Sequence, residues 1–427
     1  MERTGIVKLQ RFLDRGAVTP PAVVLGVFIG PNEIGVARYL GRRGVPVLMM
    51  DNNRHGFAVP SRYAAKMLCP DPHHDEAGFV HQLERAGREL PQKAVLFPGR
   101  DDYVLPVAAA ATRLGEHFLM PFSALPVMAR MLDKWQQIEG ARRAGVDTPH
   151  SVLLLSAGDM AGAAADVPFP AILKPTTPQA GQRHLGAKVL LLGTAAELPA
   201  AYEKASVCGP LLLQEYIPGE DDETYYLGSY LDAESRPLAV FTGRRLRQYP
   251  RGFGAARSAE SVWVPEVADA GLRLLRELRF HGVSHVEFKR DRRDGRFKLM
   301  EVNARHYGTH SLAAACGVDL SFVAYADALG RPIIAPRQRE GVKLLMASRD
   351  FVASPHEILR GELTLPEWLT SLRGTRLDGV FSFDDPLPGV AGFVHAVTRV
   401  ARRSLDKAKR RVKIGAASPP GRGGDRT

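Results

Sequence analysis

The N-terminal part of the chain alternates short apolar runs with helical stretches. AVVLGVFI, at residues 22–29, is followed by a turn with Gly, Pro and Asn, by the helical stretch GVARYLGRRG, and by the apolar run VPVLMM, which ends at Asp51. KAVLFPG begins a second such unit, which continues with Asp101 and Asp102 and an Ala-rich helix. Continuous apolar runs of this length are typical of strands buried on both faces. Residues 20–125 are therefore predicted to form a small open parallel α/β domain.

Farther along the chain, the apolar runs predict antiparallel strands. Residues 128–145 have helical periodicity, and FPAILK and AKVLLL predict two strands joined by a flap-like hairpin loop. The next strand candidates are LLLQEYI, TYYLGSYLD, LAVFTGRRLRQY, VSHVEFKRD and FKLMEVNAR. A helix from Pro265 to Phe280 lies between the third and the fourth of them. This order indicates an antiparallel α+β domain.

These patterns divide the chain into seven parts. The predicted parts are an N-terminal extension (1–19), the parallel α/β domain (20–125), a small central subdomain (126–206), an antiparallel α+β subdomain (207–335), a C-terminal appendage (336–396), a basic amphipathic helix (397–414) and a disordered tail (415–427). The turn GPNEIG differs from the GxGxxG fingerprint of dinucleotide-binding proteins, which counts against a dehydrogenase.

Positive charge is concentrated near the C-terminus. The net charge is +11, and residues 399–413 contain eight Lys or Arg against one Asp, which leaves about +4 for the rest of the chain. Apolar residues recur among these cations at roughly helical spacing, at Val397, Val400, Ala401, Leu405, Ala408 and Val412. Such a helix favours an anionic membrane surface, and nucleic acid is the less favoured partner. A solvated terminal helix is the simpler alternative.

No segment of the chain has the pattern of an export signal or a membrane span. Charges interrupt the N-terminal apolar positions, and the longest apolar runs fall far short of the ~20 residues that cross a bilayer. The three cysteines, Cys69, Cys208 and Cys316, include no CxxC pair. We therefore expect a cytoplasmic protein, with peripheral contact at the inner membrane surface as the alternative.

The segment LMEVNAR carries the strongest chemical signal. Glu301 and Asn303 are two residues apart on a predicted strand, so their side chains share one face, and Arg305 continues that face. Glu287, in HVEFK, adds a carboxylate from a neighbouring strand. Two carboxylates and an amide oxygen suit a hard divalent cation, and an arginine suits a phosphate or a carboxylate. In isolation, the segment could equally be a polar face exposed to solvent.

Other polar residues stand at strand ends upstream. Lys174 ends FPAILK, where an ammonium group can contact phosphate, although a lone lysine there is usually solvated. The loop after it has only Gly181 and Gly186, which is few for a phosphate cradle. LLLQEYIPGEDDE could offer the backbone of Glu215 and Ile217 to an adenine edge.

Taken in order, these segments resemble the ATP-grasp superfamily. The resemblance rests on Lys134, Lys174, the flap loop, QEYIPG, HVEFK and LMEVNAR, and it covers roughly residues 20–335. Within the superfamily, GPNEIGVARYLGRRGVPV, FPGRDDYV, DKW and FTGRRLRQYPRGFG are most similar to predicted carboxylate-amine ligases related to D-aspartate ligase. The resemblance implies an open α/β domain, a small central subdomain and a C-terminal α+β subdomain, with ATP held between two antiparallel sheets.

The resemblance also implies roles for particular residues. ATP would be bound by Lys134, Lys174, Gln214, Glu215, Ile217 and Asp221, with Asp221 at the ribose. One or two Mg²⁺ ions, or Mn²⁺ instead, would be bound by Glu287, Glu301 and Asn303. Arg305 would stabilise the acyl phosphate or the incoming carboxylate, and Arg245 and Arg247, on one strand face by alternation, would lie near the γ-phosphate. An exposed basic strand is the alternative for this last pair.

The resulting hypothesis is an ATP-dependent ligase that joins a small-molecule carboxylate to an amine through an acyl phosphate and releases ADP and phosphate. The alternative is a regulatory or scaffold protein that retains the ATP-binding fold with reduced catalysis. A homodimer is compatible with either. His306 and His310, in HYGTH, are expected to be structural, because no third metal ligand is evident.

Overall fold

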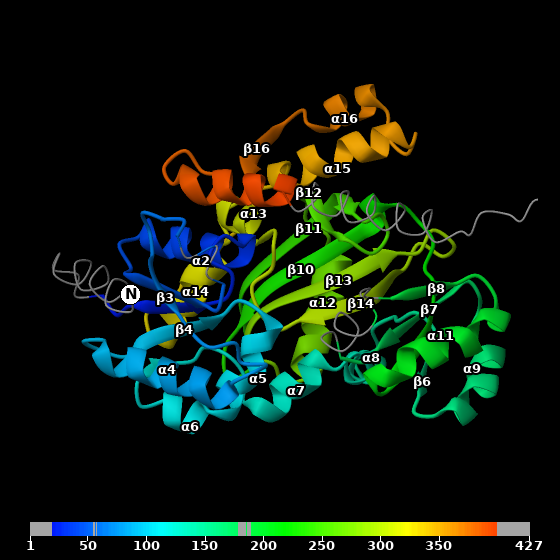
Figure 1. Ribbon diagram of the computed structural model, residues 1–427, viewed down its shortest axis with the longest axis horizontal. Coiled ribbons are helices and arrows are strands. Elements are labelled where there is room, and N and C mark those ends of the chain that lie inside the picture. The colour runs from blue at the N-terminus through cyan, green and yellow to red at the C-terminus, as the bar shows by residue number, and fades with distance from the viewer. Residues whose placement is uncertain (1–18, 54–55, 57, 178–184, 186–188, 399–427) are drawn as a thin grey trace, which may run out of the picture.

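The computed structural model describes residues 19–53, 56, 58–177, 185 and 189–398, and its first sheet is the predicted parallel one (Figure 1). The strand order is β3-β2-β1-β4-β5, with all neighbours parallel. The strands are β1 (Ala22–Leu25), β2 (Val47–Asp51), β3 (Ala65–Leu68), β4 (Ala94–Pro98) and β5 (Phe118–Leu119). The helices are α2 (Pro31–Gly41), α4 (Glu76–Glu89), α5 (Asp101–Ala109) and α6 (Ala111–Leu114). Residues of the inner strands are buried on both faces, which explains their continuous apolar runs.

A small four-stranded sheet forms the central subdomain, in the order β6-β9-β7-β8. Its strands are β6 (Ser151–Leu154), β7 (Ala171–Pro175), β8 (Leu190–Leu192) and β9 (Leu211–Glu215), and its longer helices are α9 (Met160–Asp166) and α11 (Leu198–Ala205). The assignment of LLLQEYI to the α+β subdomain was wrong, because this segment forms β9, which pairs with β6 and β7 beyond the predicted bounds 126–206. Strands β7 and β8 pair antiparallel, as predicted for the flap hairpin. Most of the flap loop itself, including Gly181 and Gly186, lies outside the described residues.

A seven-stranded sheet forms the largest layer, in the order β14-β13-β10-β11-β12-β15-β16. Its strands are β10 (Thr224–Leu231), β11 (Pro237–Tyr249), β12 (Ala255–Ser261), β13 (Gly282–Arg290), β14 (Phe297–Asn303), β15 (Lys343–Leu345) and β16 (Thr375–Asp378). The first five are antiparallel neighbours, as the α+β prediction requires. Strand β12 was not anticipated from the sequence, because AARSAES has no apolar alternation.

The C-terminal segment is more closely joined to this sheet than the predicted appendage implied. Strand β15 pairs with β12, and β16 pairs with β15, so two short strands from residues 336–396 extend the sheet. Helices α15 (Ala347–Leu359) and α16 (Leu365–Ser371) lie above its edge (Figure 1). Three- and four-residue strands are too short to give a periodic signal, and the sequence therefore did not reveal them.

Helices on the remaining faces complete the core. These are α7 (Leu125–Leu132), α8 (Lys134–Arg143), α12 (Pro265–Glu277), α13 (His310–Ala315) and α14 (Leu320–Ala328). Helix α12 packs through Leu274 and Leu275 against the large sheet, close to the predicted position. No helix within the described part of the chain is long and apolar enough to cross a bilayer.

Candidate active site

A cavity of about 450 Å³ lies between the central sheet and the large sheet. Its walls come from β7 and β9 on one side and from β11, β13 and β14 on the other, and residues of the N-terminal domain reach one end. It is lined by nine of the residues assigned to the site from the sequence, namely Lys134, Lys174, Glu215, Ile217, Arg245, Glu287, Glu301, Asn303 and Arg305. Folding therefore brings side chains from six elements and from the residues next to them into one space.

The acidic edge of the cavity is built by the pairing of β13 with β14. Glu287 lies opposite Glu301 and His285 lies opposite Asn303 in the register of the two strands. Arg245 makes a very short ion pair with Glu287, and the Lys134 Nζ lies 3.5 Å from the Glu301 Oε1. Both carboxylates therefore already stand beside a cation.

The ligand chemistry of this edge fits a divalent cation that is shared with a phosphate. In the parts of the chain that the structure describes, no group of three or more His, Cys, Asp or Glu side chains could hold a metal ion by itself. Glu287, Glu301 and Asn303 supply two carboxylates and one amide oxygen. Mg²⁺ typically uses one or two carboxylates, waters and substrate phosphates, so this set is suited to it.

The lysine pair is held by backbone and side-chain hydrogen bonds. The Lys134 backbone N–H donates to the Thr176 carbonyl at 2.9 Å, which places the start of α8 beside the end of β7. The buried Lys174 Nζ donates to the Gln214 Oε1 at 2.9 Å, and the Gln214 Nε2 donates to the Ser151 Oγ at 2.9 Å. Burial, and secondarily the charge of Lys134, lowers the pKa of Lys174 to about 7.

Gln214 does not line the cavity, so its side chain positions Lys174 rather than facing the enclosed space. The adjacent Glu215 and Ile217 do line it. The Glu215 carboxylate accepts a hydrogen bond of 2.6 Å from Arg293, and the Tyr216 N–H donates to the Pro170 carbonyl at 3.0 Å. These bonds fix the path of the chain that leaves β9.

The opposite end of the cavity is formed with the N-terminal domain. The Arg305 guanidinium makes a bidentate pair with Asp101, at 2.6 Å and 3.0 Å, and also donates to the Asn303 Oδ1 at 3.2 Å. Asp101 is the first residue of α5, directly after the edge of the parallel sheet where ligands usually bind. The ion pair therefore links the acidic edge of the large sheet to the parallel domain.

Besides Gln214, two residues assigned from the sequence lie outside the cavity lining. Strand β11 has a bulge between Arg245 and Arg247, so the expected alternation fails and the two side chains do not share a face of the cavity. Arg247 is buried and pairs with Asp350 of α15 at 2.9 Å. Asp221 accepts from the Gln248 and Gly252 N–H groups at 2.9 Å and 3.0 Å, and thus stabilises the loop after β11 instead of lining the cavity.

Several lining residues were missed in the sequence. His285 and Tyr307 stack at 4.2 Å between ring centroids, and burial, then Arg245, lowers the pKa of His285 well below its usual value. Lys289 donates to the Gly219 carbonyl at 2.8 Å and lies over the Tyr216 ring. His285 and Lys289 are each two residues from Glu287 on β13, so all three side chains share one face of the strand. Strand periodicity could therefore have identified them.

Arg349, in the first turn of α15, also reaches the cavity wall. One of its guanidinium N–H groups donates to the Ala256 carbonyl of β12 at 3.3 Å. Nothing in the local sequence SRDF indicates this position, because only the pairing of β15 with β12 brings α15 to the cavity. His306 and His310 are buried, and they bond Ser321 and the Asn32 carbonyl, as expected of structural residues.

A parallel domain beside two antiparallel sheets, with lysines and a Glu/Asn/Arg edge between the sheets, is the arrangement of the ATP-grasp fold, and this chain has that fold. A family model described as "ATP-grasp in the biosynthetic pathway with Ter operon" matches residues 238–348. The predicted fold is confirmed, and the family match agrees with the predicted resemblance to ATP-grasp proteins.

Individual similar proteins are named as ligases or synthetases. The chain is 23% identical over 273 residues to a D-aspartate ligase of Enterococcus faecium (strain Aus0004), a match that covers 60% of this chain and 65% of that ligase. The chain therefore spans just under two thirds of this relative. An N5-carboxyaminoimidazole synthetase of Staphylococcus aureus complexed with ADP has a TM-score of 0.60 at 13% identity, with 81% and 88% of the two chains covered. An L-amino acid ligase of Bacillus licheniformis has a TM-score of 0.57 at 15% identity, with 75% of each chain covered.

Proposed function

We propose that this protein is an ATP-dependent ligase that joins a small-molecule carboxylate to an amine. The observation that carries the proposal is the single cavity that connects the lysine pair, the acidic edge and the Arg305–Asp101 pair. A nucleotide at the lysines and an acid at Arg305 would meet beside Glu287 and Glu301. The names of the D-aspartate ligase and the L-amino acid ligase support the same class of reaction.

ATP would lie between the sheets, with its base against Ile217 and the backbone of Glu215 and its phosphates near Lys134 and Lys174. Glu287, Glu301 and Asn303 would hold one or two Mg²⁺ ions, with Mn²⁺ as an alternative. Bound there, the metal would neutralise charge on the phosphate oxygens. Asp221 and Arg247 are not part of this proposal, because hydrogen bonds engage both outside the cavity lining.

The reaction would begin when a carboxylate oxygen of the substrate attacks the γ-phosphorus, which breaks the bond to the β-phosphate oxygen and releases ADP. The amine would then attack the acyl carbon, the phosphate would leave with its electron pair, and the amine would lose a proton. Lys134, Lys174 and Arg245 would hold the phosphates, and Arg305 would stabilise the acyl phosphate. The sequence of steps requires no covalent bond to the enzyme.

The acid would bind among the cavity residues Asn32, Asp101, Arg305, Thr309 and Arg349. Two guanidinium groups suit a carboxylate, because each can offer a fork of N–H donors. The Asp101 carboxylate already pairs with the Arg305 guanidinium group. When Arg305 turns to the carboxylate of the substrate, the Asp101 carboxylate could receive the ammonium group of an amino acid. Amino acids are therefore the first substrates to test.

The direct test offers the purified protein Mg-ATP with pairs of amino acids and other small acids and amines. We expect equal amounts of ADP, phosphate and an amide product with at least one pair, measured by coupled ADP detection and mass spectrometry. Tight binding of ATP without turnover over a broad panel would contradict the ligase and favour a regulatory or scaffold protein.

The pKa of Lys174 predicts how nucleotide affinity depends on pH. Its ammonium group is charged below pH 7, and above that value it must take up a proton before it can pair with phosphate. The affinity for a non-hydrolysable Mg-ATP analogue should therefore fall by up to about tenfold per pH unit above pH 7. Calorimetry in buffers of different ionisation enthalpy should show uptake of about one proton.

Lys174→Arg is the matched control, because a guanidinium group stays charged throughout this range. Titration of the γ-phosphate affects both proteins equally, so the difference between them isolates Lys174. Identical pH profiles and proton uptake in the two proteins would contradict the prediction.

A further inference from the structure

The last helical residues of the described chain, 386–398, present their large side chains to solvent. Leu387, Val390, Val394 and Val397 are spaced by three or four residues and therefore lie along one side of the helix. Each of them is 44–55% exposed, Phe393 beside them is 42% exposed, and Phe383 in the preceding turn is 94% exposed. This arrangement is the reverse of a surface helix that buries its apolar side.

Small residues form the opposite side of the same helix. Pro388 and Gly389 are buried, and a Cβ at Gly389 would lie 2.6 Å from the Phe381 Cα, so glycine is needed for this close packing. Gly392 faces Val380 on the same side. The helix therefore packs through small residues and leaves an apolar stripe, Leu387, Val390, Phe393, Val394 and Val397, uncovered.

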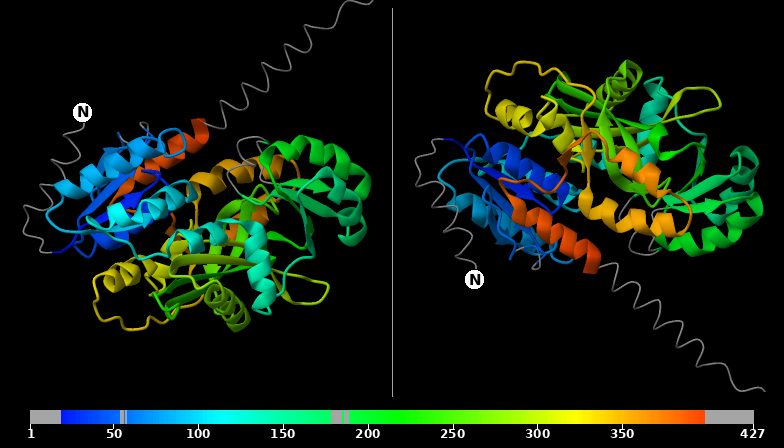
Figure 2. Two further views of the ribbon diagram at one scale, coloured as in Figure 1. Left: turned by 90° about the horizontal axis from the view of Figure 1, so that it is seen from below. Right: turned by 90° about the horizontal axis from the view of Figure 1, so that it is seen from above.

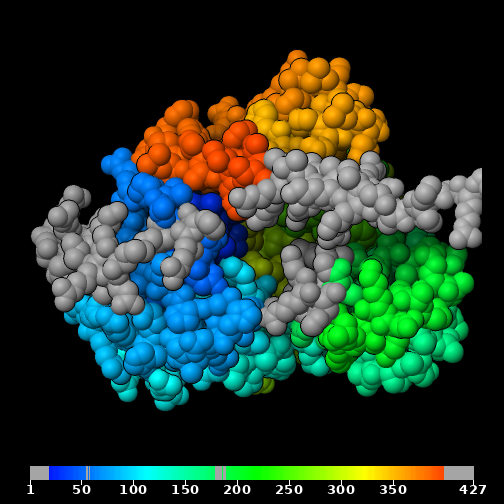
Figure 3. All heavy atoms as spheres, viewed as in Figure 1, coloured from blue at the N-terminus to red at the C-terminus, as the bar shows by residue number. Residues whose placement is uncertain are grey.

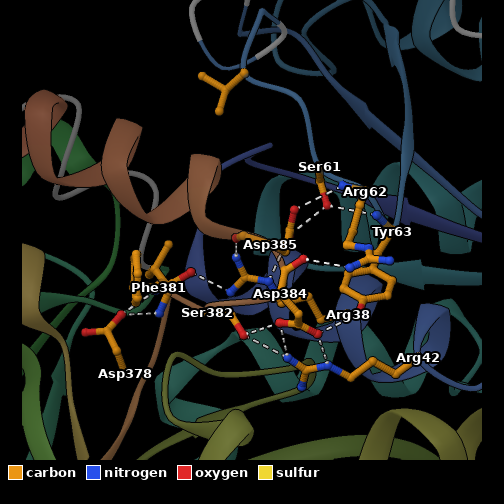
Figure 4. Close-up of polar contacts among 12 residues, drawn as sticks. Arg38, Arg42, Ser61, Arg62, Tyr63, Asp378, Phe381, Ser382, Asp384 and Asp385 are labelled. Atoms are coloured by element: carbon orange, nitrogen blue, oxygen red, sulfur yellow. Dashed lines mark hydrogen bonds and ion pairs between the residues drawn. The ribbon is translucent and has the colours of Figure 1, made fainter.

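A polar cluster fixes the orientation of this helix (Figure 4). Asp385 is buried just before it and pairs with Arg38 of α2 at 2.9 Å. Asp384 accepts from Arg42 at 2.9 Å and from the Tyr63 hydroxyl at 2.5 Å. Since these bonds anchor the start of the helix to the parallel domain, the apolar stripe is held facing outward rather than left to turn inward.

Other apolar side chains are exposed on neighbouring C-terminal elements. Leu365 and Leu369, one turn apart on α16, are about half exposed, and Leu359 at the end of α15 is more so. The views from the side and from above place α15, α16 and residues 386–398 on one side of the molecule (Figures 2 and 3). Exposed apolar side chains are therefore found on several elements of this C-terminal segment.

The sequence that follows the stripe indicates what covers it. Residues 399–413 follow this helix in the sequence and contain eight Lys or Arg and one Asp. Apolar side chains followed by a dense run of cations suit a surface that is both apolar and anionic, as the interface of a bilayer with acidic lipids is. A second copy of the chain would carry the same positive run and would repel it.

We propose that the apolar stripe binds the surface of an anionic lipid membrane. Its large apolar side chains would enter the headgroup and acyl boundary, and the positive charge that follows the stripe in the sequence favours acidic lipids as the partner. The protein would then be a peripheral membrane protein. This inference does not depend on the proposed ligase activity.

The test is sedimentation of the full chain with vesicles of phosphatidylcholine alone or mixed with phosphatidylglycerol. We expect binding to the mixed vesicles, weaker binding to phosphatidylcholine, and release as salt is raised. Val394→Asp should lower the partition coefficient about tenfold, because a charge replaces an inserted apolar group. Val394 is exposed, so an aspartate at this position can stay in solvent and the fold should be retained. Thermal melting followed by circular dichroism checks this.

Val207→Asp is the matched control, since Val207 is 63% exposed on the central subdomain, in the short helix Ser206–Cys208. It should bind vesicles like the unchanged protein. Absence of vesicle binding, or equal binding by the two variants, would overturn the proposal. Self-association in sedimentation velocity that Val394→Asp abolishes, or binding to duplex DNA but not to vesicles, would assign the surface to a second copy or to nucleic acid and would also overturn it.

Discussion

Glu301→Ala is expected to lower the rate of ATP-dependent ligation by roughly 1000-fold or more. Glu301 lies at the middle of the acidic edge, opposite Glu287 in the strand register and 3.5 Å from the Lys134 Nζ. Without it, the proposed metal site keeps one carboxylate and one amide oxygen. Loss of metal charge at a phosphoryl group raises the free energy of the transition state by several kcal/mol. An increase of about 4 kcal/mol corresponds to a roughly 1000-fold lower rate. The measurement is ADP release at saturating Mg-ATP and substrates.

Glu266→Ala is the control for this change, since Glu266 is exposed in the first turn of α12. It should retain the activity of the unchanged protein. Titration of Mn²⁺, followed by electron paramagnetic resonance in the presence of nucleotide, gives a second readout and should show weakened metal binding in Glu301→Ala. Activity within tenfold of the unchanged protein, or unaltered metal binding, would refute the assignment.

Arg257→Ala is expected to lower the free energy of unfolding by about 3–5 kcal/mol. The Arg257 side chain is fully buried on β12, and it pairs with Glu357 at 2.7 Å and donates to the Ser354 Oγ at 3.1 Å. Its removal would leave the buried Glu357 carboxylate without its principal cation. Because Arg257 joins the large sheet to α15, the change should also loosen the C-terminal segment. Urea unfolding followed by circular dichroism measures the effect.

Arg290→Ala, at the exposed end of β13, is the matched control and should change stability by less than about 0.5 kcal/mol. Limited proteolysis distinguishes local from global destabilisation, and early cleavage after residue 343 is expected in Arg257→Ala alone. A loss of stability below about 1 kcal/mol would show that the buried pair is dispensable.

Local patterns were sufficient for most of the fold. The parallel domain followed from continuous apolar runs, and four strands (β10, β11, β13 and β14) and one helix of the large antiparallel sheet followed from their periodicity. Strands β12, β15 and β16 did not, since AARSAES lacks alternation and the other two are short. Their place in the sheet is set by partners distant in sequence, and no local pattern records such pairing.

The site shows the same division. Sequence alone determined that Glu301 and Asn303 share a face and that Arg305 follows them, because the strand pleat repeats every two residues. The tertiary structure decided that Glu287 stands opposite Glu301, and that Arg245 but not Arg247 lines the cavity.

The physical reason is the range of the interactions. Side-chain alternation is a property of one strand, whereas register and bulges depend on hydrogen bonds with a partner strand. The bulge in β11 appears only when β11 pairs with β12, and Arg349 reaches the cavity only because β15 pairs with β12 in turn. The sequence alone therefore predicted an ATP-grasp fold and an acidic strand edge, and the tertiary structure decided which cations face that edge.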